Sequence, residues 1–156
     1  MKTLIRERDR EQILERLRQL EPNIVPRWGQ MTAPQMVCHL TDAFRNLLRD
    51  RPVQSKAGRP TLVGKTLVKW VALYTPLPWP KGMKTRPEAD QLIGGTPPSS
   101  RFEEDVTSLE RATHRFLVAV REGRLQEHYM FGILSAWEWS RWAYRHMDHH
   151  LRQFGL

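Results

Sequence analysis

The sequence predicts an all-α protein, and three observations favour this fold class. Four stretches carry apolar residues three and four positions apart, which is the period of a helix with one buried face. Three of these stretches begin with Ser or Thr followed three positions later by Glu or Gln, the capping box that starts many helices. No segment shows a convincing run of the alternation typical of a half-buried strand. Four main amphipathic helices pack most simply as a four-helix bundle.

The first helix is expected over residues 3–21, where apolar side chains are interleaved with Arg and Glu at spacings that allow ion pairs one turn apart. The second helix is expected to begin at a capping box of Thr32 and Gln35, with Pro34 in its first turn. His39 falls at the edge of the apolar arc of this helix rather than at its centre. The arc consists of Met36, Val37, Leu40, Ala43, Phe44, Leu47 and Leu48.

Residues 51–100 hold most of the eleven prolines and are expected to form a long insertion between the second and third helices. Within it, residues 62–74 are apolar enough for one short helix, which is too short to span a bilayer. The third helix is expected to start at a capping box of Ser100 and Glu103 and to be closed by Gly123.

The length of 156 residues is enough for one domain with its own core, so residues 1–156 are expected to form a single domain. The N-terminus becomes charged before an apolar stretch of signal-peptide length appears, so a cytoplasmic protein is expected. The one cysteine, Cys38, has no partner for an internal disulfide, which fits a reducing compartment. Its expected role is that of a small core residue.

The net charge of +8 is concentrated in one segment. Residues 45–86 contain ten basic residues and one acid, Asp50, which gives this segment a net charge of +9. Such a segment suggests nucleic acid, an anionic lipid or an acidic small molecule as partner. No helix-turn-helix, zinc-finger or aromatic RNA-binding pattern occurs in the sequence, so nucleic acid is not favoured. The alternative to an enzyme is a basic binding module, in which residues 45–86 bind nucleic acid or an anionic membrane and the histidines serve structure. Residues 62–74 suit a membrane surface, but a membrane is not favoured either.

The most informative pattern is a pair of histidines near the C-terminus. The last helix is expected to begin at a capping box of Ser135 and Glu138, and it carries His146 and His150 on its apolar face. Two imidazoles that face a core need hydrogen bonds or a cation, because a buried unpaired polar group costs about 1–3 kcal/mol. A metal ion satisfies both rings at once, and a hydrogen-bonded core pair is the alternative. The charged residues of the opposite side are Arg141, Arg145, Asp148 and Arg152.

His39 is the expected third ligand, supplied by the second helix. Three neutral imidazoles leave one or more positions open for water or substrate, as in reactive metal sites, and they suit Zn, Ni, Co or Fe. Gln153, one turn beyond His150, is expected to orient a ligand ring or a bound water, with a surface glutamine as the alternative. His149 and His128 are further candidates for the surroundings of the metal. For His149 the alternative is packing, and for His128 it is a solvated loop.

Several short motifs resemble those of a known family. The stretch PQMVCHL at residues 34–40, followed by HMDHHLRQ at residues 146–153, resembles the DinB/YfiT-like superfamily, whose members bind a metal inside a four-helix bundle. The stretches LPWPKG at residues 77–82 and HHLRQFG at residues 149–155 resemble more closely one subfamily, known as a domain of unknown function. The resemblance implies a DinB-like bundle with a metal held by His39, His146 and His150.

The resemblance also implies relatives that include thiol-dependent S-transferases and isomerases, which use mycothiol, bacillithiol or glutathione. The predicted function is therefore a metal-dependent enzyme, either a thiol-dependent S-transferase or a metal-assisted hydrolase, because a metal lowers the pKa of a bound thiol or water. The basic insertion is expected to cover the metal and to offer Lys or Arg to a small anionic substrate. Exposed helix faces allow a homodimer. The tryptophans expected to line the core and the pocket are Trp79, Trp137, Trp139 and Trp142.

Overall fold

The structure is a computed structural model that describes residues 1–50, 61–82, 90 and 94–156, and in these ranges the fold is all-helical. This agrees with the predicted all-α class. The same ranges contain no β-strand, only an isolated antiparallel bridge between His128 and Gly132. No helix among the described residues combines the length and the apolar character needed to cross a membrane. The elements are α1 (Glu7–Arg18), α2 (Ala33–Leu47), η1 (Gly64–Val68), α3 (Lys69–Tyr74), α4 (Phe102–Arg121) and α5 (Ala136–Gln153).

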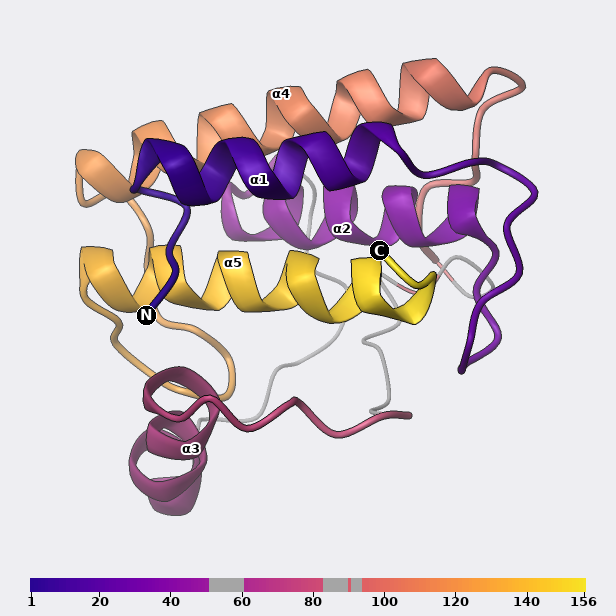
Figure 1. Cartoon of the computed structure of the whole chain (residues 1–156). Helices are drawn as coiled ribbons and strands as arrows, with labels where there is room; N and C mark the ends of the chain where they lie inside the picture. The colour runs from indigo at the N-terminus through magenta and orange to yellow at the C-terminus, as the bar shows by residue number, and fades with distance from the viewer. Residues whose placement is uncertain (51–60, 83–89, 91–93) are drawn as a thin grey trace.

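The four longest helices, α1, α2, α4 and α5, lie side by side with their axes roughly aligned (Figure 1). α2 packs along α4, α1 packs along α5, and α5 also contacts α2 and α4. The colour gradient shows that α2 and α4 run in one direction, whereas α1 and α5 run in the other. Because α2 and α4 are successive long helices of the same direction, the segment between them must return along their length. η1 and α3 belong to this segment and lie outside the four helices, where α3 contacts α5.

The starts of α2 and α5 confirm two of the predicted capping boxes. The Thr32 hydroxyl accepts the N–H of Gln35, and the Gln35 side chain accepts the N–H of Thr32 at 2.9 Å. At α5, the Ser135 hydroxyl accepts the N–H of Glu138, and the Glu138 carboxylate accepts the N–H of Ser135 at 2.8 Å. These two helices carry the predicted metal ligands, so their starting points determine where the histidine rings lie.

The first helix is shorter than residues 3–21. α1 begins at Glu7, because the backbone before it is held by side chains instead of by helical hydrogen bonds. The N–H of Thr3 donates to the Asp9 carboxylate at 3.0 Å, and the N–H of Ile5 donates to the Ser140 hydroxyl at 2.6 Å. The second of these contacts ties the start of the chain to α5.

The predicted capping box of Ser100 and Glu103 was wrong, since the residue before α4 makes no side-chain cap. Ser99 forms the local hydrogen bonds in its place, and its N–H donates to the Asp105 carboxylate at 3.0 Å. Ser99 and Asp105 therefore organise the turn before α4, in place of Ser100 and Glu103. The predicted end of the helix is confirmed, because Gly123 follows α4 with a φ of 64°.

The predicted short helix over residues 62–74 is present, and η1 forms a π-helical part of it. The Thr61 hydroxyl accepts the N–H of Gly64 at 3.0 Å. A Cβ atom at Gly64 would lie 2.6 Å from the carbonyl oxygen of Met130, so only glycine allows this approach. The close contact holds η1 against the loop that precedes α5.

Two buried arginines of α5 hold α3 and the segment after it. Arg141 and Arg145 are 7% and 8% exposed. The Arg141 guanidinium donates to the carbonyl of Leu73 at 3.1 Å. Arg145 donates to the carbonyls of Thr75, at 2.5 Å, and of Leu77. Burial, followed by the charge of Arg141, lowers the pKa of Arg145 to about 10, so the group stays charged at neutral pH.

Glu138 is expected to make the stability of the fold depend on acid pH. Burial raises its pKa, but hydrogen bonds from Ser135, Lys69 and Tyr74 outweigh burial and lower the pKa below the ordinary 4.5. The stability that such a carboxylate contributes is complete above its unfolded-state pKa and is lost as the pH falls through the folded-state pKa.

Glu138→Gln keeps a side chain that completes the capping box, so it isolates the effect of the charge. We expect a loss of about 1 kcal/mol in the free energy of unfolding at neutral pH, shrinking as the pH falls below 4.5 and through the lowered folded-state pKa of Glu138. Urea denaturation of both proteins at neutral pH and across this acid range measures the difference. A difference that does not change with pH would contradict the assignment.

Candidate metal centre

The three predicted histidines are brought together by α2 and α5. His39 lies in the middle of α2, and His146 and His150 lie one turn apart in the second half of α5. One nitrogen from each ring lies within 4.8 Å of the other two. The Nε2 atoms of His39 and His146 are 3.2 Å apart, and the ring centre of His150 lies 4.7 Å from that of His39. The fold therefore gathers three imidazoles at one point.

The spacing of these nitrogens fits a divalent transition metal. Two imidazole nitrogens at about 2.1 Å from a tetrahedral ion are about 3.4 Å apart. The 3.2 Å between His39 and His146 is close to that separation, and the ligand nitrogen of His150 lies within 4.8 Å of theirs. Imidazole donors of this kind suit Zn, Ni, Co or Fe. Within the described ranges, these residues form the one group of three His, Cys, Asp or Glu side chains with such spacing.

Burial keeps His146 and His150 neutral. The pKa values of His146 and His150 lie well below 6.5, first because burial disfavours the charged ring and then because other histidines lie nearby. A neutral imidazole has the lone pair that a metal requires. The Nδ1 atom of His146 is buried without a hydrogen-bond partner in the described part of the chain.

Gln153 orients the ring of His150. Its Oε1 atom lies 3.1 Å from His150 Nδ1, which donates to it when the proton is on Nδ1. The lone pair is then on Nε2, the nitrogen free for a metal. The Gln153 amide nitrogen in turn donates to the carbonyl of Trp28 at 2.7 Å, so the loop before α2 fixes the amide. Gln153 thus occupies the position expected of a residue that orients a ligand, and it is 3% exposed rather than on the surface.

Gly29 leaves the room that Gln153 needs. Its φ is 81°, and a Cβ atom there would lie 2.5 Å from the Gln153 amide nitrogen. Gly29→Ala is therefore expected to displace the Gln153 amide and to weaken metal binding about 10- to 100-fold, the range for loss of a residue that orients a metal ligand. Gly123→Ala is the matched control, because Gly123 also has a positive φ but has nothing within 4 Å of its added Cβ. Calorimetric metal titration of both variants tests this, and equal affinities would exclude the role of Gln153.

Aromatic rings enclose the histidines. The ring centre of Trp142 lies 5.1 Å from that of His146. The ring centre of Trp79, from the insertion, lies 6.1 Å from that of His146 and 6.2 Å from that of His149, and the Arg145 guanidinium lies over the Trp79 ring, 5.6 Å from its centre. The described part of the insertion therefore reaches the site through Trp79. The basic residues of the insertion that lie outside the described residues are Arg51, Lys56, Arg59, Lys84 and Arg86.

His128 is a core residue and not the solvated loop residue named as its alternative. It is 1% exposed, and its ring stacks on Phe131 at 4.6 Å. Its Nδ1 accepts the N–H groups of Met130 and Phe131, both at 3.2 Å. Its ring centre lies 5.4 Å from that of Trp142, which in turn lies against His146. Trp142 therefore separates His128 from the three clustered nitrogens.

Cys38 is a small core residue, as predicted from its position beside His39. It is 3% exposed. Burial, followed by the nearby charges of Asp105 and Asp42, raises the pKa of the thiol to about 12. The thiolate that metals and electrophiles require is thus strongly disfavoured at neutral pH.

A pocket of about 350 Å³ lies beside the histidines. Its walls include Trp28, Trp79 and His149, and the ring centre of His149 lies 5.2 Å from that of His150. Trp28 was not predicted as part of the site, since its loop has no helical periodicity. The glycine that follows Trp28 was the one local signal that the backbone there is used for a close approach.

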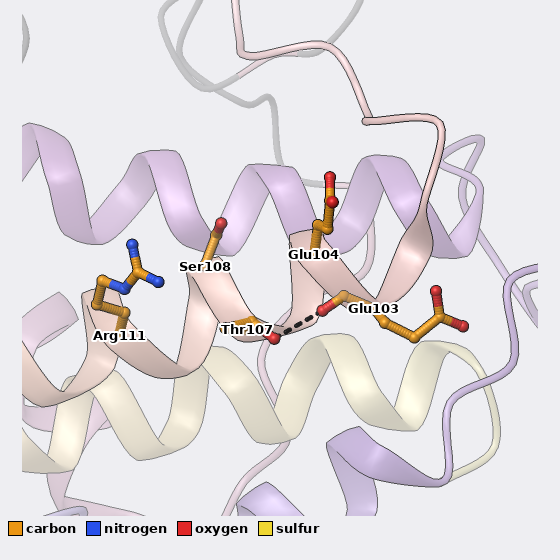
Figure 2. A pocket seen from close by; sticks show the side chains of 5 residues that line it. All are labelled: Glu103, Glu104, Thr107, Ser108 and Arg111. Carbon is orange, nitrogen blue, oxygen red and sulfur yellow. Dashed lines mark hydrogen bonds between the residues drawn. The ribbon is translucent and has the colours of Figure 1, made fainter.

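A second hollow, of about 270 Å³, lies on the outer side of α4 (Figure 2). Figure 2 shows that its side chains all come from successive turns of this one helix. None of the clustered histidines lines it, so it forms part of the helix surface and carries no functional argument. The residues that line it are Glu103, Glu104, Thr107, Ser108 and Arg111.

Comparisons with protein-family models, with curated proteins and with solved structures found no match to this chain. The family resemblance seen in the sequence motifs therefore stays a prediction. The geometry of the histidines and of the pocket beside them is the basis for assigning a function.

Proposed function

We propose that this chain is a metal-dependent enzyme of the DinB-like superfamily. The observation that carries the proposal is the convergence of His39, His146 and His150, which come from distant parts of the chain. The arrangement of four long helices, with a long connection between α2 and α4, supports a DinB-like bundle. The motifs at residues 34–40 and 146–153 support the same family.

The chain's own residues have separate tasks in this proposal. His39, His146 and His150 hold a divalent ion as neutral donors. Gln153 keeps His150 in the tautomer that presents Nε2, and Trp79 limits the access of bulk water. When bound, the ion lowers the pKa of a thiol or a water at its open position. Thiol-dependent S-transfer and metal-assisted hydrolysis both fit, and no side chain is assigned as catalytic acid or base.

Metal titration followed by thiol titration tests the proposal. Chelator-treated protein is titrated with Zn²⁺, Ni²⁺, Co²⁺ and Fe²⁺, and about one ion per chain is expected for the metal that fits best. Mycothiol, bacillithiol and glutathione are then titrated into the metal-loaded protein. Absence of metal binding would contradict the proposed enzyme. Metal binding without binding of any thiol would exclude S-transfer and leave hydrolysis.

We propose attachment to an anionic membrane surface as a second candidate function, because the outer face of the short helix over residues 63–74 is apolar. Its large side chains are between 37% and 60% exposed, and contiguous apolar patches on soluble proteins usually mark an interaction. Trp and Leu beside lysines are typical of helices that lie in the lipid headgroup region. Lys65 is exposed on this helix, within the basic segment. The outer face consists of Val63, Leu67, Trp70 and Tyr74.

Vesicle sedimentation tests the membrane candidate. Binding is expected to phosphatidylserine-containing vesicles and not to pure phosphatidylcholine, and Leu67→Ser combined with Trp70→Ser should abolish it. Val25→Ser, at a side chain that is 80% exposed elsewhere, is the control. Binding that survives His146→Ala would show that it is independent of metal. A dimer in sedimentation velocity without vesicle binding would assign the face to self-association instead.

A further inference from the structure

We infer that the pocket beside the histidines binds small organic anions, in which a carboxylate or phosphate is joined to an apolar body. The evidence for an anion site is the set of side chains that line the pocket, whereas the role of the pocket as the substrate site rests on the proposed function. The volume of about 350 Å³ is in the range of small-molecule sites.

The pocket has an excess of positive charge. Three cations line it, Arg27, Lys81 and Arg152, and no acidic side chain does. Neither Arg27 nor Lys81 forms an ion pair with any part of the chain that the structure describes. Arg152 pairs with Asp148 at 2.9 Å, but Asp148 also pairs with Arg16 at 2.7 Å. One carboxylate therefore serves two guanidinium groups, and an anion in the pocket would complete the pairing.

Two of these cations are held in place by specific contacts. The backbone N–H of Arg27 donates to the carbonyl of Gln153 at 2.7 Å. Its guanidinium lies against Gly155, where a Cβ atom would be 2.5 Å from Nη2. The Lys81 ammonium lies 4.4 Å from the ring centre of Trp28, in cation–π geometry. Both charges are thus positioned before any ligand arrives, which lowers the cost of binding.

The remaining walls are aromatic and lead to the histidine cluster. The ring centres of Trp28 and Trp79 lie 6.1 and 6.2 Å from that of His149. His149 lies against His150, and Trp79 lies against His146. One layer of rings therefore separates the pocket from the clustered nitrogens. A ligand whose anionic group pairs with the cations has these rings as the surface for its apolar body.

Calorimetric titration with benzoate, phenyl phosphate and the neutral benzyl alcohol tests the inference on chelator-treated protein. The anions are expected to bind at least about tenfold more tightly than benzyl alcohol, and added salt should weaken their binding. Arg27→Met and Lys81→Met should each lower the affinity for the anions about tenfold. Arg18→Met, at an exposed arginine of α1 that pairs with Glu110, is the matched control and should leave it unchanged.

Gly155→Ala is a second variant that keeps every charge. It should displace the Arg27 guanidinium and weaken anion binding as Arg27→Met does. Equal affinities for anionic and neutral probes, or equal anion affinities in wild type and both charge variants, would overturn the inference.

The use of metal-free protein separates this test from the test of the metal centre. Anion binding by protein that takes up no metal supports the anion site and contradicts the proposed enzyme. Metal binding without anion binding overturns the anion site alone. In metal-loaded protein, a changed anion affinity links the pocket to the centre, and an unchanged affinity contradicts its role as the substrate pocket.

Discussion

Replacing His146 by alanine is expected to bring the metal content of the purified protein close to zero. His146 lies against both other ligands, since its Nε2 is 3.2 Å from that of His39 and its ring centre is 5.0 Å from that of His150. Loss of a residue that only orients a ligand weakens metal binding up to about 100-fold. Loss of the ligand His146 itself should therefore weaken metal binding by at least that factor. Elemental analysis of both proteins, and calorimetric titration with Zn²⁺, measure the effect.

Two further histidine variants show whether the loss is specific. His114→Ala removes an exposed ring on α4 and should leave the metal content unchanged. His128→Ala removes a core ring that accepts two backbone N–H groups, so it should lower the free energy of unfolding by about 2–3 kcal/mol while the metal is retained. A His146→Ala protein that holds as much metal as wild type would rule out the three-histidine centre.

Arg145→Met is expected to lower the free energy of unfolding by about 2–4 kcal/mol, because it leaves two backbone carbonyls without their buried donor. These are the carbonyls of Thr75 and Leu77, in the segment that leads to Trp79. Methionine keeps much of the apolar volume of the side chain, so the loss reports on the hydrogen bonds. Urea denaturation measures the change in free energy, and tryptophan fluorescence should report the release of Trp79 from its position against His146.

Arg152→Met is the matched control for this prediction. It removes the same charge from the same helix, but the Arg152 side chain is 62% exposed and pairs with Asp148 one turn away. An exposed pair of this kind contributes less than about 1 kcal/mol. If Arg145→Met and Arg152→Met lower the free energy of unfolding by the same small amount, water replaces Arg145 as the donor to the carbonyls of Thr75 and Leu77.

The sequence was sufficient to predict most helices and the His146 and His150 pair, because the signals for both are local. The capping boxes of α2 and α5 involve residues three positions apart, and the His146 and His150 pair follows from a single helical turn. The cap of α4 was missed for a local reason as well. Two adjacent serines precede this helix, and the acceptor position of Asp105 selects Ser99.

The surroundings of the site could not be predicted, because they depend on partners far away in the chain. Gln153 donates to a carbonyl 125 positions earlier, and Arg145 donates to one 70 positions earlier. No pattern in the loop around Trp28 indicates these contacts before the helices are packed. His128 was misplaced for the same reason, since its loop folds back through a bridge to Gly132 and buries the ring.

The ligand helices α2 and α5 run in opposite directions, and His39 meets His146 across 107 positions of sequence. In the proposed function, a single ion is thus a coordinate cross-link between early and late parts of the polypeptide. A covalent bridge closing a loop of that size reduces the conformational freedom of the unfolded chain by about 4–5 kcal/mol in the entropic treatment. Loading the ion should accordingly raise the melting temperature, so thermal unfolding reports occupancy before any substrate is known.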